Sequence, residues 1–355
     1  MYKKHTPSCG SLLKVLVHQS DTILLPIIQK HHSDKWSKKL STRDQLEILV
    51  SAHLAQAKSL GDITEMIKGT GKFSCSSINK SSLSRVNRYR DFHIFEQLYH
   101  TLLKQVRKRI PYSSLRVIDS TSEVVSQNLF PLWPYDRSHS AIKVTVLFDP
   151  YYELPDKIVV STRKVGDMQS AYKLPIKRGI TYLIDGGFRD YDLYDKYIDH
   201  HAYFITRQHR VAKFQVTEDL PLTQPDVISD QIGLLGVTHN RMKNKTRLIR
   251  LWDDSGKEML LSTNRFDLPT ETIRELYRKR WDIEVFFKFL KQNLKLKKFF
   301  GSSKNAVKTQ IYCALIAYLL AYLLKPKTTK MYEFIRKIHY ALFLNFSKLT
   351  FFNTS

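Results

Sequence analysis

The spacing of apolar residues changes at Ser114, and this change limits the folds open to the chain. Before this position, apolar residues recur every three or four positions, as in amphipathic helices. After it, short runs rich in β-branched residues alternate with polar residues, as in half-buried strands. The sequence therefore predicts a helical segment followed by an α/β segment.

The α/β segment has a definite order of elements. It predicts strands at 115–119, 141–149 and 154–162, a helix at 169–177, a strand at 181–184, a helix at 188–200 and a strand at 202–206. This β-β-β-α-β-α-β order is the topology of an RNase H-like core. The first strand ends in Asp119 and the fourth in Asp185, each after apolar residues. Sites of α/β sheets form at the carboxyl edge, so we expect the two carboxylates to meet there.

The rest of the chain completes the domain organisation. Residues 209–266 predict more strands, and a long helical region resumes at Pro269. We interpret the fold as α/β, with an RNase H-like catalytic core interrupted by a β-rich insertion and preceded by an α-helical N-terminal domain. The predicted parts are a helical DNA-binding domain at 1–108, the first part of the core at 109–208, the insertion at 209–266, the final core helices at 267–326 and a peripheral C-terminal segment at 327–355.

The N-terminal segment predicts basic helices. Apolar spacing favours helices at 12–29 and 43–57, and Ser41 is placed to cap the second of them. A third, basic helix is predicted from Ser81 to Arg109. Residues 1–109 hold 19 Lys and Arg against 8 Asp and Glu, which favours DNA binding over a merely solvated basic surface.

The overall charge points to a polyanionic partner. The chain has 57 Lys and Arg against 33 Asp and Glu, a formal net charge of +24. Nucleic acid and an anionic membrane surface both fit this excess. The longest apolar run, 311–324, is shorter than the ~20 residues that span a bilayer, so it predicts a buried core helix and no membrane partner. The three Cys lie far apart, which indicates a reducing compartment and neither a zinc site nor a disulfide framework.

A third carboxylate lies in the predicted helix 277–294. Tyr277, Arg280, Glu284 and Lys291 fall at offsets of 0, 3, 7 and 14, within ~60° of one another on one face, and Lys288 extends the stripe. The opposite face is apolar and is expected to pack on the sheet through Ile283, Phe286, Phe289 and Leu290. An ordinary amphipathic helix with a solvated basic face explains the cations but not the single Glu among them.

Three carboxylates on separate elements suit phosphodiester chemistry. Hydrolysis and transesterification of phosphodiesters commonly use two metal ions ~4 Å apart. Magnesium prefers oxygen ligands and needs neither His nor Cys. Asp119, Asp185 and Glu284 would suffice as ligands, and Gly186 and Gly187 would let a phosphate approach the backbone closely.

At these residues the chain resembles bacterial transposases of the insertion-sequence-four type. Their signature is Tyr, two residues, Arg, three residues, Glu, six residues and Lys, which 277–291 matches without a gap. The resemblance covers roughly 115–325 and includes Ile-Asp-Ser-Thr at 118–121 and Ser-Thr-Asn-Arg-Phe-Asp-Leu-Pro at 262–269. The chain departs from the family at Gly186-Gly187-Phe188, where a charged residue followed by Gly-Tyr is frequent.

The resemblance implies a DDE transposase that cleaves the ends of an insertion sequence and joins them to target DNA. Asp119, Asp185 and Glu284 would be the catalytic residues and the ligands of two Mg²⁺ ions, which Mn²⁺ could replace. Tyr277, Arg280 and Lys291, with Lys288 beside them, would contact double-stranded DNA at the terminal inverted repeats. The insertion would help to manage the cut end, with Trp252 either a base-stacking platform or a core residue. The active form would be a homodimer in a synaptic complex, in the bacterial cytoplasm and associated with the nucleoid.

Two alternatives stay open from the sequence. An RNase H-like nuclease that cuts DNA without strand transfer would use similar carboxylates, although it would not need the Tyr-Arg-Glu-Lys stripe. A DNA-binding protein derived from a transposase would have lost catalysis, although decay usually removes one carboxylate and all three are present.

Overall fold

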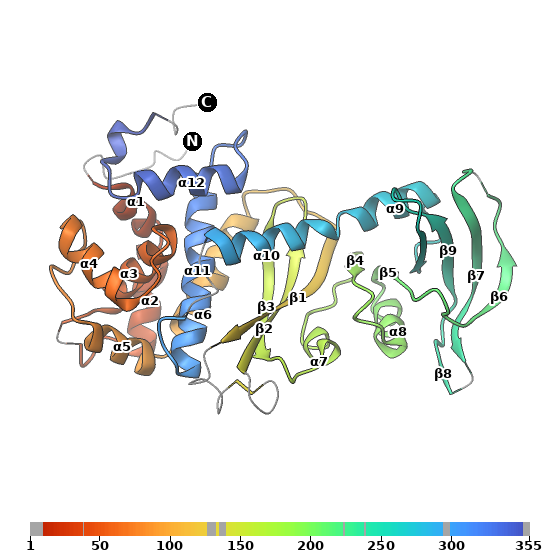
Figure 1. Ribbon diagram of the computed structural model, residues 1–355, viewed down its shortest axis with the longest axis horizontal. Coiled ribbons are helices and arrows are strands. Elements are labelled where there is room, and N and C mark those ends of the chain that lie inside the picture. The colour runs from red at the N-terminus through yellow and green to blue at the C-terminus, as the bar shows by residue number, and fades with distance from the viewer. Residues whose placement is uncertain are drawn as a thin grey trace.

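The computed structural model describes residues 10–37, 39–125, 133–134, 140–222, 224–237, 239–293 and 299–350. Helices from both ends of the chain gather at one end of an elongated molecule, and a single large sheet extends from them to the other end (Figure 1). The predicted α/β class is confirmed.

Helices form the N-terminal part of the described chain, as predicted. They are α1 (Leu12–His18), α2 (Asp21–His31), α3 (Thr42–Leu54), α4 (Leu60–Thr70), α5 (Lys80–Tyr89) and α6 (His93–Arg107). The predicted start of α3 is confirmed, because the Ser41 side chain caps the backbone N–H of Asp44 and the Asp44 carboxylate accepts from Ser41 in return.

Two helices predicted as continuous are each broken, and α4 was not predicted. The break between α1 and α2 falls at Ser20, whose hydroxyl donates to the Val17 carbonyl. The break between α5 and α6 falls at Arg90, whose nearly buried guanidinium donates to the carbonyls of Ser41 and Leu40. These hydrogen bonds tie the segment between α5 and α6 to the start of α3, a contact between distant residues that helical spacing does not reveal.

Two short helices interrupt the series of the first five strands. They are β1 (Leu115–Val125), β2 (Ser140–Asp149), β3 (Leu154–Thr162), β4 (Thr181–Ile184) and β5 (Tyr203–Arg207), with α7 (Asp167–Ala171) before β4 and α8 (Tyr191–Asp199) before β5. Their spatial order is β3-β2-β1-β4-β5. Pairing is antiparallel from β3 to β1 and parallel from β1 to β5.

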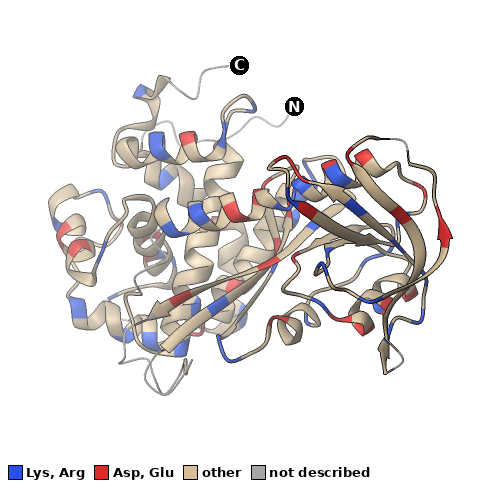
Figure 2. Cartoon of the chain, turned by 45° about the vertical axis from the view of Figure 1, so that its right-hand side comes forward, with Lys and Arg blue, Asp and Glu red and all other residues tan. Residues whose placement is uncertain are grey.

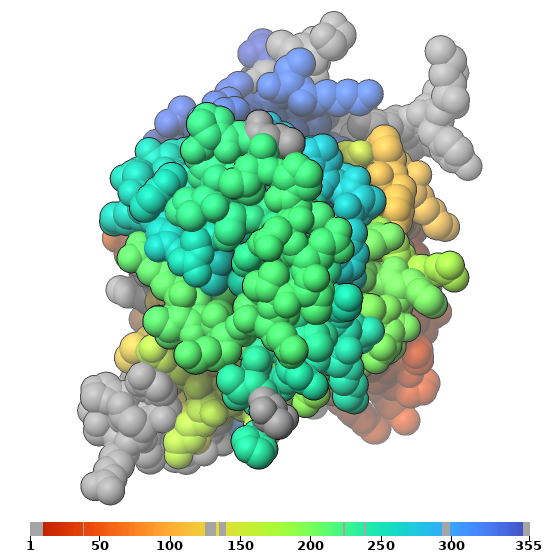
Figure 3. All heavy atoms as spheres, turned by 90° about the vertical axis from the view of Figure 1, so that its right-hand side faces the viewer, coloured from red at the N-terminus to blue at the C-terminus, as the bar shows by residue number. Residues whose placement is uncertain are grey.

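The strands that follow continue the same sheet. They are β6 (Phe214–Asp219), β7 (Val227–Val237), β8 (Asn240–Arg241), β9 (Thr246–Trp252) and β10 (Glu258–Thr263). Strand β10 pairs antiparallel with β5, and the order runs on as β10-β9-β7-β6. Viewed from the far end of the sheet, the surface consists mainly of these later strands, coloured green to cyan (Figure 3).

The remaining helices link the sheet to the N-terminal helices. They are α9 (Thr270–Arg278), α10 (Trp281–Asn293), α11 (Lys304–Leu324) and α12 (Met331–Ala341), followed by the 3₁₀ helix η2 (Phe346–Lys348). The apolar run predicted as a core helix lies in α11, which packs against α3 and α6. Among the described residues α11 is the one helix long and apolar enough to cross a membrane, but 78% of its most apolar window is buried inside the protein.

A buried ion pair fixes the start of α9 to the later strands. Arg247 of β9 donates two hydrogen bonds, of 2.7 and 2.6 Å, to the carboxylate of Asp230 on β7. The Thr270 hydroxyl joins both side chains, and the Leu268 carbonyl accepts from Arg247. The Asp230 and Arg247 side chains are only 2% and 7% exposed, so the pair orients α9 from inside the protein.

We predict that Asp230→Ala lowers the free energy of unfolding by about 3–5 kcal/mol, because it leaves the buried guanidinium without its counter-charge. Urea unfolding followed by circular dichroism measures the change. The double variant Asp230→Leu, Arg247→Met removes both charges and should recover most of the loss. A loss below about 1 kcal/mol for Asp230→Ala would show that the pair does not anchor α9.

Candidate active site

The register of the sheet brings Asp119 and Asp185 to the same level. Strands β1 and β4 pair in parallel over four residues, and the last pair is Ile118 with Ile184. The next residue on each strand is the aspartate. The prediction that Asp119 ends its strand is wrong, because β1 continues to Val125 by pairing with β2. Only the pairing with β4 stops before Asp119, since its last pair is Ile118 with Ile184. The sheet is therefore open beside the Asp119 carboxylate.

A tight turn holds Asp185 at the end of β4. Its backbone carbonyl accepts from the N–H of Phe188 and its carboxylate from the N–H of Gly187. A Cβ atom on Gly186 would lie 3.1 Å from the backbone carbonyl oxygen of Arg207, the last residue of β5. This distance is tighter than an ordinary Cβ contact, so a larger residue at 186 requires the turn or β5 to shift by a few tenths of an ångström.

The third carboxylate comes from a helix that differs from its prediction. The stripe Tyr277, Arg280, Glu284 and Lys291 was assigned to one helix, but the chain breaks between α9 and α10. The backbone N–H groups of Lys279, Arg280, Asp282 and Ile283 bond to carbonyls three residues back, so the helix tightens there. Tyr277 therefore lies in α9, Arg280 at the junction and Glu284 in the first turn of α10.

The predicted apolar face of α10 is confirmed, and it fixes where Glu284 points. Ile283, Phe286, Phe289 and Leu290 are all buried. The Phe286 ring stacks on Phe148 of β2 at 4.8 Å and meets Tyr318 of α11 edge-on at 5.5 Å. Helix α10 is thus clamped between sheet and α11, which leaves Glu284 at the rim of the sheet.

The guanidinium of Arg280 contacts all three predicted carboxylates. Its Nη2 atom donates to Glu284 Oε1 at 2.8 Å. Its Nη1 atom lies 3.9 Å from Asp119 Oδ2 and 3.6 Å from Asp185 Oδ1. The two aspartate oxygens are therefore at most about 7.5 Å apart, the sum of these two distances. The structure thus gathers Asp119, Asp185 and Glu284 around one cation.

Burial and nearby charges shift the ionisation of Asp119. Its pKa is raised to about 6, chiefly by burial and also by the charges of Asp185 and Glu284, although the Ser120 N–H and Arg280 act in the opposite direction. Tyr277 is 8% exposed, and burial raises the pKa of its phenol to about 12, so it stays neutral beneath Arg280. The cluster carries more negative charge than Arg280 balances.

The donor set fits a hard divalent cation. Three carboxylates from separate elements supply the oxygen ligands that magnesium prefers. Within the described residues, no group of three or more His, Cys, Asp or Glu stands close enough to hold a metal ion in the present arrangement, in which Arg280 lies between the carboxylates. Metal binding would require the guanidinium to move.

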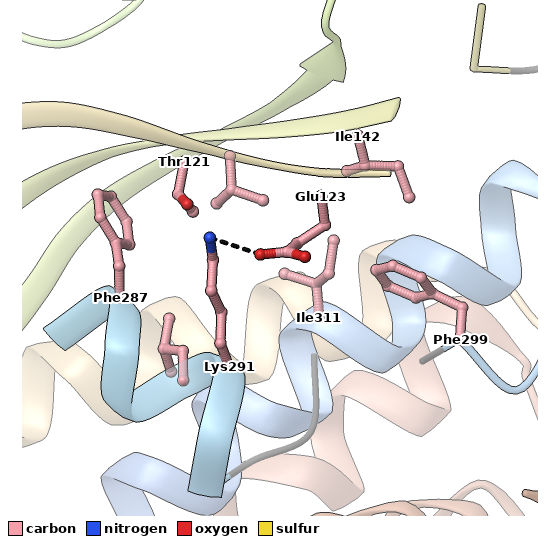
Figure 4. A pocket seen from close by; sticks show the side chains of 9 residues that line it. Thr121, Glu123, Ile142, Phe287, Lys291, Phe299 and Ile311 are labelled. Carbon is pink, nitrogen blue, oxygen red and sulfur yellow. Dashed lines mark ion pairs between the residues drawn. The ribbon is translucent and has the colours of Figure 1, made fainter. Parts of the chain in front are cut away.

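The two predicted lysines have different surroundings. Lys288 is exposed and has no ion-pair partner among the described residues. Lys291 points at the sheet, where its ammonium lies 2.5 Å from Glu123 of β1 (Figure 4). Asp119, Glu284, Lys288 and Lys291 are among the residues that line an open cleft of about 410 Å³. Bands of Lys and Arg and bands of Asp and Glu both occur along the helical stretch formed by α9 and α10 (Figure 2).

Sequence reasoning missed several polar neighbours of this cleft. Glu123 lies four residues after Asp119 on β1, so strand alternation places both on one face. That signal was available, but the strand was predicted to end too early. Asp167 accepts from the Ser120 hydroxyl at 2.7 Å and pairs with Lys143 at 3.0 Å, contacts that only the folded chain reveals.

Trp252 is 47% exposed, so its interpretation as a core residue is wrong.

Comparison with known proteins identifies transposases. The chain is 26% identical over 337 residues to a probable transposase for insertion sequence element IS5377 of Geobacillus stearothermophilus, covering 92% of this chain and 87% of that protein. It is 28% identical over 252 residues to the putative transposase y4zB of Sinorhizobium fredii strain NGR234, covering 67% and 69%. It is 25% identical over 280 residues to a putative transposase for insertion sequence element IS4SA of Synechocystis, covering 73% and 77%.

A solved structure and two family profiles also match. The structure is the piggyBac transposase synaptic complex with hairpin DNA, at a TM-score of 0.47 and 10% identity over 95% of this chain and 80% of that chain. Residues 18–72 match a domain of unknown function, DUF4372. Residues 112–320 match the Transposase DDE domain. This last match spans more than half of the chain and includes all three clustered carboxylates, and the chain therefore belongs to the family of transposases with a DDE domain.

Proposed function

We propose that this transposase cleaves the ends of an insertion sequence and joins them to target DNA, using Asp119, Asp185 and Glu284 as its catalytic carboxylates. The observation that carries the proposal is their convergence, since β1, the end of β4 and α10 each place one carboxylate within 4 Å of the Arg280 guanidinium. Membership of the DDE family supports the assignment of a DNA-cleaving enzyme.

We also infer that the catalytic core is RNase H-like and that the chain is of the insertion-sequence-four type. The order β3-β2-β1-β4-β5, with helices before β4 and β5, supports the first inference. Strands β6–β10 then form the insertion between the core and its final helices. The gapless Tyr-Arg-Glu-Lys spacing supports the second inference, together with the placement of its arginine and glutamate in the carboxylate cluster.

Asp119, Asp185 and Glu284 would hold the metal ions, Mg²⁺ or Mn²⁺. When bound, two such ions activate the attacking oxygen and stabilise the leaving oxygen of a phosphodiester. The residues of the chain position the catalytic carboxylates. The clamp on α10 fixes Glu284, and the turn at Gly186 fixes Asp185, so little reorganisation is needed around the scissile phosphate.

The cations along α10 would bind the DNA end. Lys288 is exposed at the cleft and its charge is unmatched by any acidic side chain of the described residues, so it is the first to meet a phosphate. Arg280 and Lys291 now pair with carboxylates and would exchange these partners for phosphate oxygens. Two ends have to be brought together for joining, so we propose a homodimer on double-stranded DNA as the active form.

We predict that Glu284→Gln abolishes strand cleavage and leaves binding to the end DNA within about twofold of wild type, because it removes a ligand charge but keeps the side-chain shape. The assay incubates the protein with a duplex of its terminal repeat, target plasmid and Mg²⁺ or Mn²⁺, and it resolves nicked, hairpin and joined products. Glu275→Gln, the same change at an exposed position on α9, is the matched control.

Each outcome of this assay is informative. Near-normal cleavage by Glu284→Gln would show that Glu284 is not a ligand. Cleavage by the wild-type protein without any joined product would indicate a nuclease that lacks strand transfer. Binding of the repeat without cleavage in either metal would indicate a non-catalytic DNA-binding protein.

We predict that Arg280→Ala strengthens Mn²⁺ binding to the DNA-free protein by at least about tenfold. The guanidinium now competes for the carboxylates, and a hydrogen bond to a charged group contributes roughly 1.5–3 kcal/mol. Calorimetric titration with Mn²⁺ measures the affinity. Arg278→Ala, which removes a neighbouring arginine paired with Asp254 instead, should leave it unchanged. Equal affinities for wild type and Arg280→Ala would refute the competition.

We predict that Lys288→Ala, Arg280→Ala and Lys291→Ala each flatten the salt dependence of binding to a terminal-repeat duplex. Each phosphate contact that a variant removes should reduce the slope of log K against log salt by ~0.9. Lys288→Ala should weaken binding most at low salt, because no intramolecular ion pair has to be broken before Lys288 binds. Fluorescence anisotropy at several salt concentrations provides the slopes. A wild-type slope for all three variants would mean that these side chains are only exposed to solvent and do not contact DNA phosphates.

A further inference from the structure

A second cavity, of about 720 Å³, lies away from the carboxylate cluster. Its walls come from α6, the starts of β1 and β4, the start of β3 and the segment before β4. Six basic residues line it, together with a single carboxylate, that of Asp156; the basic residues are Lys104, Arg107, Lys108, Arg116, Lys157 and Lys177.

The two arginines of this cavity are structural. Arg107 of α6 donates to Asp149 and Asp156, at 2.5 Å in each case. Arg116 of β1 donates to Asp156 at 2.5 Å and lies 3.2 Å from Asp149. Two aspartates therefore balance two guanidinium groups, and these pairs tie α6 to the sheet. A ligand gains little from cations whose charge is already matched.

The four lysines are different. None of them has an ion pair with an acidic side chain within the described part of the chain, and Lys104, Lys108 and Lys177 are exposed. His100, on the same wall, has a buried Nε2 atom without a hydrogen-bond partner. Burial lowers the pKa of His100, and the nearby Lys157 and Lys104 lower it further, against the opposite effect of Glu96. The unmatched charge thus lies around the rim.

This basic cavity is separate from the carboxylate cluster. Arg116 and Asp119 are three positions apart on β1, so strand alternation directs their side chains to opposite faces of the sheet. Tyr182 and Leu147, which line the cavity, pack in the hydrophobic cluster of the α8 face. Phe148 and Val117 belong to the cluster that includes α10. A duplex that lies along α10 therefore does not reach this rim by the same contacts.

We propose that the rim lysines Lys104, Lys108, Lys157 and Lys177 bind the phosphodiester backbone of a DNA segment other than the one held at the carboxylates. Exposed lysines around an open cavity suit an extended polyanion, because each can meet a separate phosphate and release a counterion. A small anion would instead seek the deep arginines, which Asp149 and Asp156 already occupy. The binding is sequence-independent, since it reads only phosphates.

The test replaces the four rim lysines by glutamine in the full-length chain. Binding to a random-sequence duplex is measured by fluorescence anisotropy at several salt concentrations. The slope of log K against log salt should fall in magnitude by ~0.9 for each phosphate contact that the variant loses. We expect a loss of at least about two phosphate contacts. The matched control changes four exposed basic residues of the C-terminal segment to glutamine in the same way, Lys327, Lys330, Arg336 and Lys348, and should keep the wild-type slope.

A slope for the rim variant equal to that of the control would overturn the proposal. Calorimetric titration with inorganic phosphate tests the other source of anions, and tight phosphate binding with an unchanged DNA slope would assign the cavity to a small anion and likewise overturn it. If thermal unfolding shows that the quadruple variant is unstable, Lys104→Gln with Lys177→Gln, both at exposed positions, gives the same comparison. DNA cleavage by the wild-type protein is measured separately. A failure of the proposed catalytic function can therefore be distinguished from a failure of the proposed DNA binding by the rim lysines.

Discussion

Strands β1 and β4 lie far apart in the chain, yet they pair in parallel over just four residues, and this short pairing sets the geometry of the carboxylates. Its last pair, Ile118 with Ile184, puts Asp119 and Asp185 at the same level of the sheet. A slip of one residue would turn one aspartate to the opposite face. Val117 and Leu183 pack in the hydrophobic cluster that includes α10, and Ile118 and Ile184 pack in the one that includes α8. A slip would move the residues of one strand into the other cluster, so the packing on both faces resists it.

The cluster concentrates like charges and therefore needs a cation. In the DNA-free protein Arg280 takes that role through contacts with all three carboxylates. The break between α9 and α10 makes this possible, since the tightened turn directs Arg280 at the sheet edge while Glu284 stays in the first turn of α10. Metal ions would compete with Arg280 for the carboxylates, and DNA phosphates would compete with the carboxylates for Arg280. The binding of metal and the binding of DNA are therefore linked through this residue.

Packing contacts from both ends of the molecule support α10. Helix α11 packs on α10 through Tyr318 and on the N-terminal helices α3 and α6. One hydrophobic cluster therefore joins the N-terminal helices, the sheet and the site helix. At the other end, the Asp230–Arg247 pair fixes the start of α9.

The sequence alone predicted the α/β class, the helical N-terminal part, the buried α11 and the apolar face of α10, because local periodicity records which side of an element is buried. It also singled out Asp119, Asp185 and Glu284, and their catalytic role stays a proposal. Strand ends, helix breaks and ion pairs were decided only by the tertiary structure. Strand β1 runs past Asp119 because β2 pairs with it, the guanidinium groups of Arg90 and Arg280 at two helix breaks contact residues far along the chain, and Lys291 meets Glu123 across two elements. Such contacts join residues far apart in the chain, so no local pattern encodes them.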